Sequence, residues 1–183
     1  HVTYFWNGNR SGYINDKLET YIKIPSDNIP FERTPGMKAF EITEKTIELL
    51  KTGQYRFGRV NFANGDMVGH TGVMEAAVEA VETVDKCLLR LRKAITKLGG
   101  IMVVTADHGN ADEMFVIKDG KRLVKTSHTL NPVPFAIYDP LYNNEYKMAK
   151  VEKPGLTNVA ATLLNLLGFE KVEDYDDSLI EFN

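Results

Sequence analysis

The sequence has a single cysteine, Cys87, among its 183 residues. A disulfide within the chain and a zinc site built from several cysteines are therefore both excluded. The apolar residues around Cys87 have helical spacing, so the sequence predicts a thiol buried in the core. A lone free cysteine is also typical of a reducing compartment, and we expect a cytoplasmic protein.

Long apolar runs are missing as well, and no stretch approaches the roughly 20 residues that a membrane-spanning helix requires. The chain opens on HVTYFWNG, without an initiating Met or the apolar core of a secretory leader. Because this opening resembles a strand already under way, we expect the chain to be cut from something longer. The net charge of −3, with acids and bases mixed, gives no sign of a nucleic-acid partner.

Apolar periodicity divides the chain into alternating helices and strands. Helical spacing predicts three helices, each followed by a glycine, at residues 38–51, 73–98 and 157–167. Short apolar runs predict strands at residues 2–6, 59–63, 101–106 and 134–138. Asp119-Gly120 is a hairpin turn signal between residues 115–117 and 123–125. Residues 7–36, rich in Gly, Pro, Asn and Asp, are predicted to form a long loop.

This alternation favours an α/β fold with a mostly parallel sheet flanked by helices. We expect the run at residues 101–106 to be a central strand, buried on both faces. In such sheets, functional sites form at the carboxyl ends of the strands. The loops that follow or precede the predicted strands are therefore where ligand-binding residues are expected.

Acids and histidines gather in three such loops. NFANGDMVGHTG holds Asp66 and His70, TADHGNAD holds Asp107 and His108, and KTSHTLNPVP holds His128. Three of the chain's four histidines thus lie at predicted strand ends, and His1 has no such context.

Carboxylate and imidazole together suit Mn²⁺ or Zn²⁺. Asp66, His70 and His128 could hold one ion, and Asp107 and His108 a second. Two ions about 3.5–4 Å apart would clamp a phosphoryl group during in-line transfer. The simpler alternatives are that Asp66 caps a helix and that each histidine is a polar loop residue. No nearby hydroxyl has a base beside it, so the pattern identifies no catalytic nucleophile.

The three motifs resemble, almost residue for residue, those of the cofactor-independent phosphoglycerate mutases. HVTYFWNGN and GLTNVAATLLNLLG are similar too, so the resemblance covers nearly the whole chain. It implies a three-layer, alkaline phosphatase-like fold and an isomerase of glycolysis. This isomerase interconverts 3-phosphoglycerate and 2-phosphoglycerate through a phosphoserine, with two divalent ions, usually Mn²⁺. Mg²⁺, Co²⁺ and Zn²⁺ also tolerate such ligands.

The resemblance also implies what residues 1–183 lack. Matched motif by motif, Asp66, His70 and His128 would hold one ion, and Asp107 and His108 the other. The family's nucleophilic serine, a further aspartate ligand and the inserted transferase domain belong to chain absent from this sequence. The chain therefore resembles the carboxy-terminal portion of the phosphatase domain, an incomplete domain expected to be inactive alone and to need its amino-terminal part as partner.

Two alternatives stay open from the sequence. One is another alkaline phosphatase-like phosphomutase or phosphohydrolase, which the sequence upstream of His1 would distinguish. The other is a non-catalytic module in which the acids and histidines only bridge turns, which a metal titration would distinguish.

Overall fold

The computed structural model describes residues 2–183, which form two compact units with mixed α and β structure. The first unit contains the residues up to Leu91 together with Gly109–Leu130, and the second contains Arg92–His108 and Asn131–Asn183. No helix within residues 2–183 is both long and apolar enough to cross a membrane.

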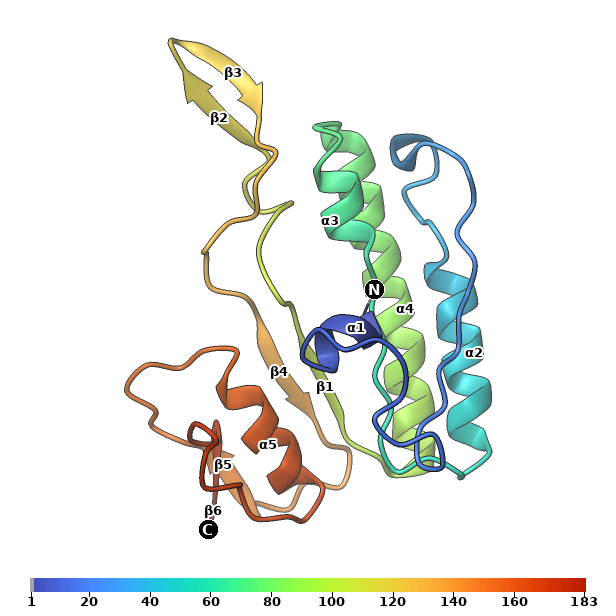
Figure 1. Ribbon diagram of the computed structural model, residues 1–183, viewed down its shortest axis with the longest axis vertical. Coiled ribbons are helices and arrows are strands. Elements are labelled where there is room, and N and C mark those ends of the chain that lie inside the picture. Colours follow the sequence, from blue (N-terminus) through green and yellow to red (C-terminus); the bar gives the residue numbers. More distant parts are fainter. Residues whose placement is uncertain (1) are drawn as a thin grey trace. The chain divides into compact units, whose positions relative to one another are not determined.

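Helices α2 (Ala39–Lys51) and α4 (Met74–Leu98) form the body of the first unit and lie side by side (Figure 1). Both confirm the helices expected from apolar spacing, and an ion pair between Glu44 and Arg90 joins them. Cys87 on α4 is fully buried, as predicted.

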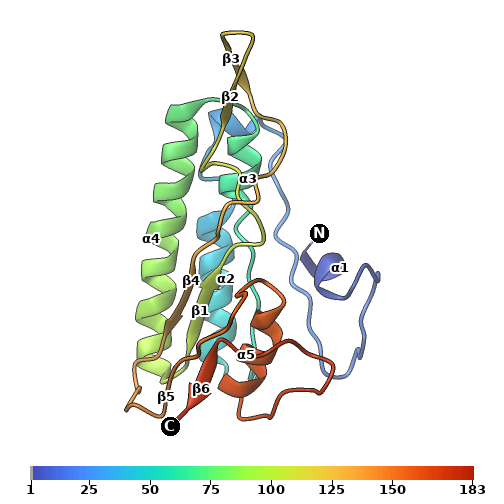
Figure 2. The ribbon, with the colours of Figure 1, turned by 90° about the vertical axis from the view of Figure 1, so that its left-hand side faces the viewer.

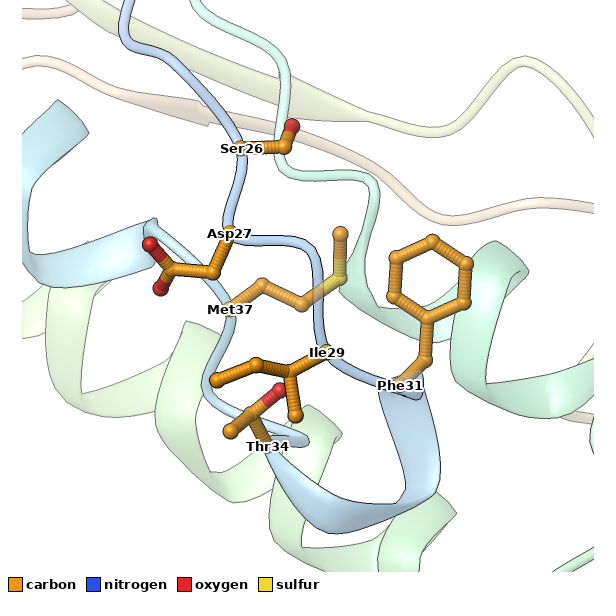
Figure 3. A pocket seen from close by; sticks show the side chains of 6 residues that line it. All are labelled: Ser26, Asp27, Ile29, Phe31, Thr34 and Met37. Atoms are coloured by element: carbon orange, nitrogen blue, oxygen red, sulfur yellow. The ribbon is translucent and has the colours of Figure 1, made fainter.

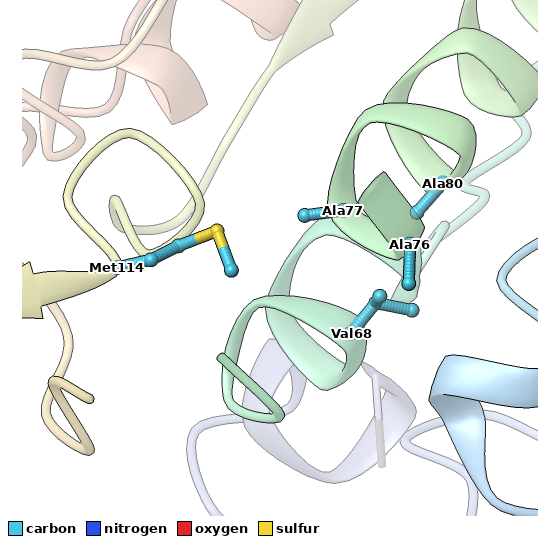
Figure 4. Close-up of a cluster of buried hydrophobic side chains, with 5 residues drawn as sticks. All are labelled: Val68, Ala76, Ala77, Ala80 and Met114. Carbon is cyan, nitrogen blue, oxygen red and sulfur yellow. The ribbon is translucent and has the colours of Figure 1, made fainter. Parts of the chain in front are cut away.

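The core of the first unit forms where α4 packs against the short helix α3 (Asn64–Gly69). Val68 of α3 is fully buried, and the α4 residues that face it are small. Figure 4 shows this cluster, whose members are Val68, Ala76, Ala77, Ala80 and Met114. Small side chains on α4 allow the two helices to approach closely, and Met114 fills the remaining space. The core therefore fixes α3 against α4.

A hairpin follows Met114 in the first unit. Strands β2 (Phe115–Lys118) and β3 (Lys121–Val124) pair antiparallel, with Lys118 opposite Lys121. Asp119 and Gly120 both have positive φ, 52° and 73°, as a type I′ turn requires. The hairpin predicted from Asp119-Gly120 is thus confirmed.

The predicted long loop, residues 7–36, follows α1 (Val2–Trp6) and contains one 3-10 turn, η1 (Phe31–Arg33). Phe31 and Met37 pack against the core, and between them the loop encloses a small hollow (Figure 3). Its lining is Ser26, Asp27, Ile29, Phe31, Thr34 and Met37. The carboxylate of Asp27 lies 2.8 Å from the ammonium of Lys38, so the hollow's one acidic group is already paired.

The second unit holds β1 (Met102–Thr105), β4 (Phe135–Tyr138), β5 (Tyr146–Met148), α5 (Asn158–Leu166) and β6 (Ile180–Phe182). Strand β1 pairs antiparallel with β4, and β5 pairs antiparallel with β6 (Figure 2). The buried hydroxyl of Thr162 on α5 accepts a 2.8 Å hydrogen bond from the backbone of Leu179, which joins the helix to the segment entering β6.

Two of the expected strands need correction. Residues 2–6 form helix α1, and residues 59–63 form no strand. A short apolar run becomes a strand only beside a hydrogen-bonding neighbour, and the described residues supply none at either place. All strand pairs in residues 2–183 are antiparallel, so the mostly parallel sheet is not confirmed. Strand β1 has only β4 beside it there, and its residues are half-buried or exposed.

The start of α5 is held by the side chain of Asn158, the first residue of the helix. Thr157 stands at the N-cap of α5 but makes no side-chain capping hydrogen bond. The side-chain oxygen of Asn158 accepts from the backbone of Gly155, and its amide nitrogen donates to the carbonyl of Asp177.

Val68→Ala tests the packing of α3 against α4. Removing two buried carbon atoms costs transfer free energy and leaves a cavity, so we expect unfolding free energy to fall by roughly 2 kcal/mol. Val78→Ala is the matched control, since Val78 on α4 is 51% exposed while Val68 is 0% exposed. Denaturant unfolding measures both, and equal losses would contradict this description of the core.

Candidate metal centre

Helix α3 carries two of the predicted ligands on one face. Asp66 and His70 are four residues apart, at the first turn and the C-cap of the helix, so their side chains project to the same side. Asn64 anchors this helix, because its buried amide nitrogen donates to the carbonyls of Pro35 and Gly36 at 2.8 and 2.9 Å. The Asn64 side chain thus joins the start of α3 to the loop before α2.

His128 reaches the same place from the segment after β3. The backbone of Thr129 donates to the carbonyl of Gly109 at 2.9 Å, which forms an isolated bridge. The Thr129 hydroxyl donates to a carboxylate oxygen of Asp112 at 3.0 Å. The turn at residues 109–112 therefore holds the segment that carries His128.

The three side chains converge on one point. Oδ1 of Asp66 lies 3.2 Å from Nε2 of His70 and 3.1 Å from Nε2 of His128, and the two Nε2 atoms are 3.2 Å apart. Two ligands bonded to one ion at about 2.1 Å, at tetrahedral or octahedral angles, lie about 3.0–3.4 Å apart. The spacing and the chemistry of these donors therefore fit a single divalent ion of the first transition row.

Asn110 completes the group on its inner side. Its amide nitrogen lies 2.9 Å from Oδ1 of Asp66 and 3.0 Å from Nε2 of His70. The structure therefore places Asn110 against two of the predicted ligands. The three ligand side chains are each partly exposed, so a small ion or a phosphate oxygen could reach them from solvent.

Asp107 and His108 lie in the second unit, directly after β1. Oδ1 of Asp107 is 3.7 Å from Nε2 of His108, and the Asp107 side chain is 77% exposed. Their assignment to a second ion stays a prediction. His1 lies outside the described residues.

The nearby hydroxyl that the sequence set aside behaves as a turn residue. Oγ1 of Thr71 donates to the carbonyl of Val68 at 2.7 Å and accepts from the backbone of Val73 at 3.2 Å. Lys125, just after β3, pairs with Glu113 at 2.9 Å.

Known proteins are similar to this chain in sequence. The chain is 52% identical to a probable 2,3-bisphosphoglycerate-independent phosphoglycerate mutase of Leptospira interrogans, over 99% of this chain and 34% of the relative. It is 50% identical to 2,3-bisphosphoglycerate-independent phosphoglycerate mutase 1 of Arabidopsis thaliana, with the same coverage. The chain thus spans about a third of the length of these relatives.

A solved structure agrees with the sequence comparison. The phosphoglycerate mutase of Leishmania mexicana, determined at low cobalt concentration, matches all of this chain and 35% of its own, with a TM-score of 0.93 and 47% identity. The sequence model of the metalloenzyme superfamily matches residues 1–171. With nearly its whole length matched in this way, the chain belongs to the metalloenzyme superfamily.

Proposed function

We propose that this chain is the metal-binding, carboxy-terminal part of a 2,3-bisphosphoglycerate-independent phosphoglycerate mutase. The protein would interconvert 3-phosphoglycerate and 2-phosphoglycerate in the cytoplasm. The observation that carries the proposal is the convergence of Asp66, His70 and His128 within 3.1–3.2 Å of one another. Identity of 47–52% to proteins named phosphoglycerate mutases supports the choice of substrate.

In this proposal Asp66, His70 and His128 hold one ion, and Asp107 and His108 contribute to a second. A bound divalent ion supplies positive charge that stabilises the transferring phosphoryl group. The carboxylate of Asp66 offers negative charge to the ion, and each imidazole must present an unprotonated Nε2. Mn²⁺ is the ion we expect, and the Leishmania mexicana structure, determined in the presence of cobalt, supports a divalent metal in general.

The remaining chemistry is assigned to the rest of a longer chain. We propose that it supplies the nucleophilic serine, a further aspartate ligand and the groups that grip the glycerate. We also propose that it completes an alkaline phosphatase-like, mostly parallel sheet in which β1 and β4 take part. Apolar side chains left partly exposed around this pair, such as Ile101 at 37%, support a neighbour there.

His128→Ala should abolish most Mn²⁺ binding at the first site. The change removes one of three ligands, so we expect affinity to fall by more than the roughly 10–100-fold typical of a group that only supports a ligand. Titration followed by the EPR signal of free Mn²⁺ measures this. The neighbouring exposed Ser127 provides the control, and Ser127→Ala should bind as the unchanged protein does. Equal binding by His128→Ala would rule out the centre.

The activity itself is tested by comparing two lengths of chain. The 183-residue chain with Mn²⁺ should give no turnover of 3-phosphoglycerate, because the proposed nucleophile lies elsewhere. The complete protein should form 2-phosphoglycerate, measured by coupling to its dehydration. Turnover by the shorter chain, or release of inorganic phosphate by the complete protein in place of 2-phosphoglycerate, would contradict the proposal.

A further inference from the structure

We propose that Asn110 is a positioning residue of the Asp66–His70–His128 centre. Gly69 is needed because a larger side chain at that position would displace the side-chain amide of Asn110. The inference rests on the metal centre proposed above. It assigns no ligand role to Asn110: the amide acts through Asp66 and His70.

The orientation of the Asn110 amide follows from its partner. An ionised carboxylate only accepts hydrogen bonds, so the atom 2.9 Å from Oδ1 of Asp66 must be the amide nitrogen. Asn110 is 7% exposed, so water offers this nitrogen little alternative. The bond therefore fixes one oxygen of Asp66 at the point where the two imidazoles meet.

The same nitrogen acts on His70. It lies 3.0 Å from Nε2 of that imidazole, and an amide nitrogen can only donate. Nε2 has a single lone pair, so this contact holds the His70 ring in place only until an ion takes that lone pair, and the lasting effect of Asn110 is on Asp66. Oδ1 of Asp66 has lone pairs for both the amide and an ion, so its bond to Asn110 can persist when an ion is held.

Gly69 leaves room for the amide on its other side. A Cβ at Gly69 would lie 2.1 Å from Oδ1 and 3.1 Å from Cγ of Asn110, and 3.4 Å from the backbone nitrogen of Ala111. Gly69 has ordinary helical geometry in α3, so the backbone itself would accept alanine. The space occupied by Asn110 is therefore the reason that a side chain is excluded there.

Helix α3 also contains a matched control. Gly65 lies one turn earlier in the same helix, and a Cβ there would meet nothing within 4 Å. Both substitutions replace glycine by alanine in the same short helix, and the contact with Asn110 is the difference that they are chosen to test.

Co²⁺ binding by the complete protein tests the inference, with affinity and the visible absorption of the bound ion as readouts. We expect Asn110→Ala to bind about 10–100-fold more weakly than the unchanged protein and to shift the absorption bands. Gly69→Ala should do the same, and Gly65→Ala should change neither. Asn110→Ala and Gly69→Ala both act through the Asn110 amide, so their effects should not add. The variant with both changes should bind Co²⁺ within about 3-fold of the single variant that binds more weakly.

Each other result has a defined meaning. If the unchanged protein fails to bind Co²⁺, the proposed function falls and the inference falls with it. If the unchanged protein binds but Asn110→Ala binds within about 3-fold of it with the same spectrum, the inference alone is overturned. If Gly69→Ala does not fold, as thermal unfolding would show, Asn110→Ala decides alone, because it only removes atoms.

Discussion

Three atoms that carry lone pairs meet at one point of this molecule, and much of the first unit keeps them there. Oδ1 of Asp66 and the Nε2 atoms of His70 and His128 are 3.1–3.2 Å apart, although the two histidines are 58 residues apart in sequence. Such a group stays together only if hydrogen-bond donors or a cation balance its negative charge. Asn110 supplies one donor, and the geometry fits an ion as the other source of positive charge.

The supporting structure places each of the proposed ligands by a different contact. Val68, buried against α4, fixes the helix that carries Asp66 and His70, while Asn64 joins the start of that helix to the loop before α2. The turn at residues 109–112 holds His128 through Thr129 and contacts Asp66 and His70 through Asn110. The packing of the core therefore also determines where the proposed ligands lie. Small residues allow the close contacts on which both depend.

The sequence predicted local features well because they depend on nearby residues. The spacing of α2, α4 and α5, the Asp119-Gly120 hairpin and the buried Cys87 were all confirmed. The strands predicted at residues 2–6 and 59–63 were wrong, because strand formation depends on a neighbouring strand that the local sequence does not specify. The grouping of Asp66, His70 and His128 was predicted from motifs next to expected strands, one of which does not form, but the contacts of Asn110 depend on how distant segments pack. The second ion site at Asp107 and His108 stays a prediction.

The most direct measurement of the central claim is anomalous diffraction at the manganese edge from crystals of the complete protein grown with Mn²⁺. The account predicts a peak about 2.0–2.3 Å from Oδ1 of Asp66 and from the Nε2 atoms of His70 and His128. A manganese peak bound elsewhere, with these three atoms still in contact through hydrogen bonds alone, would contradict it.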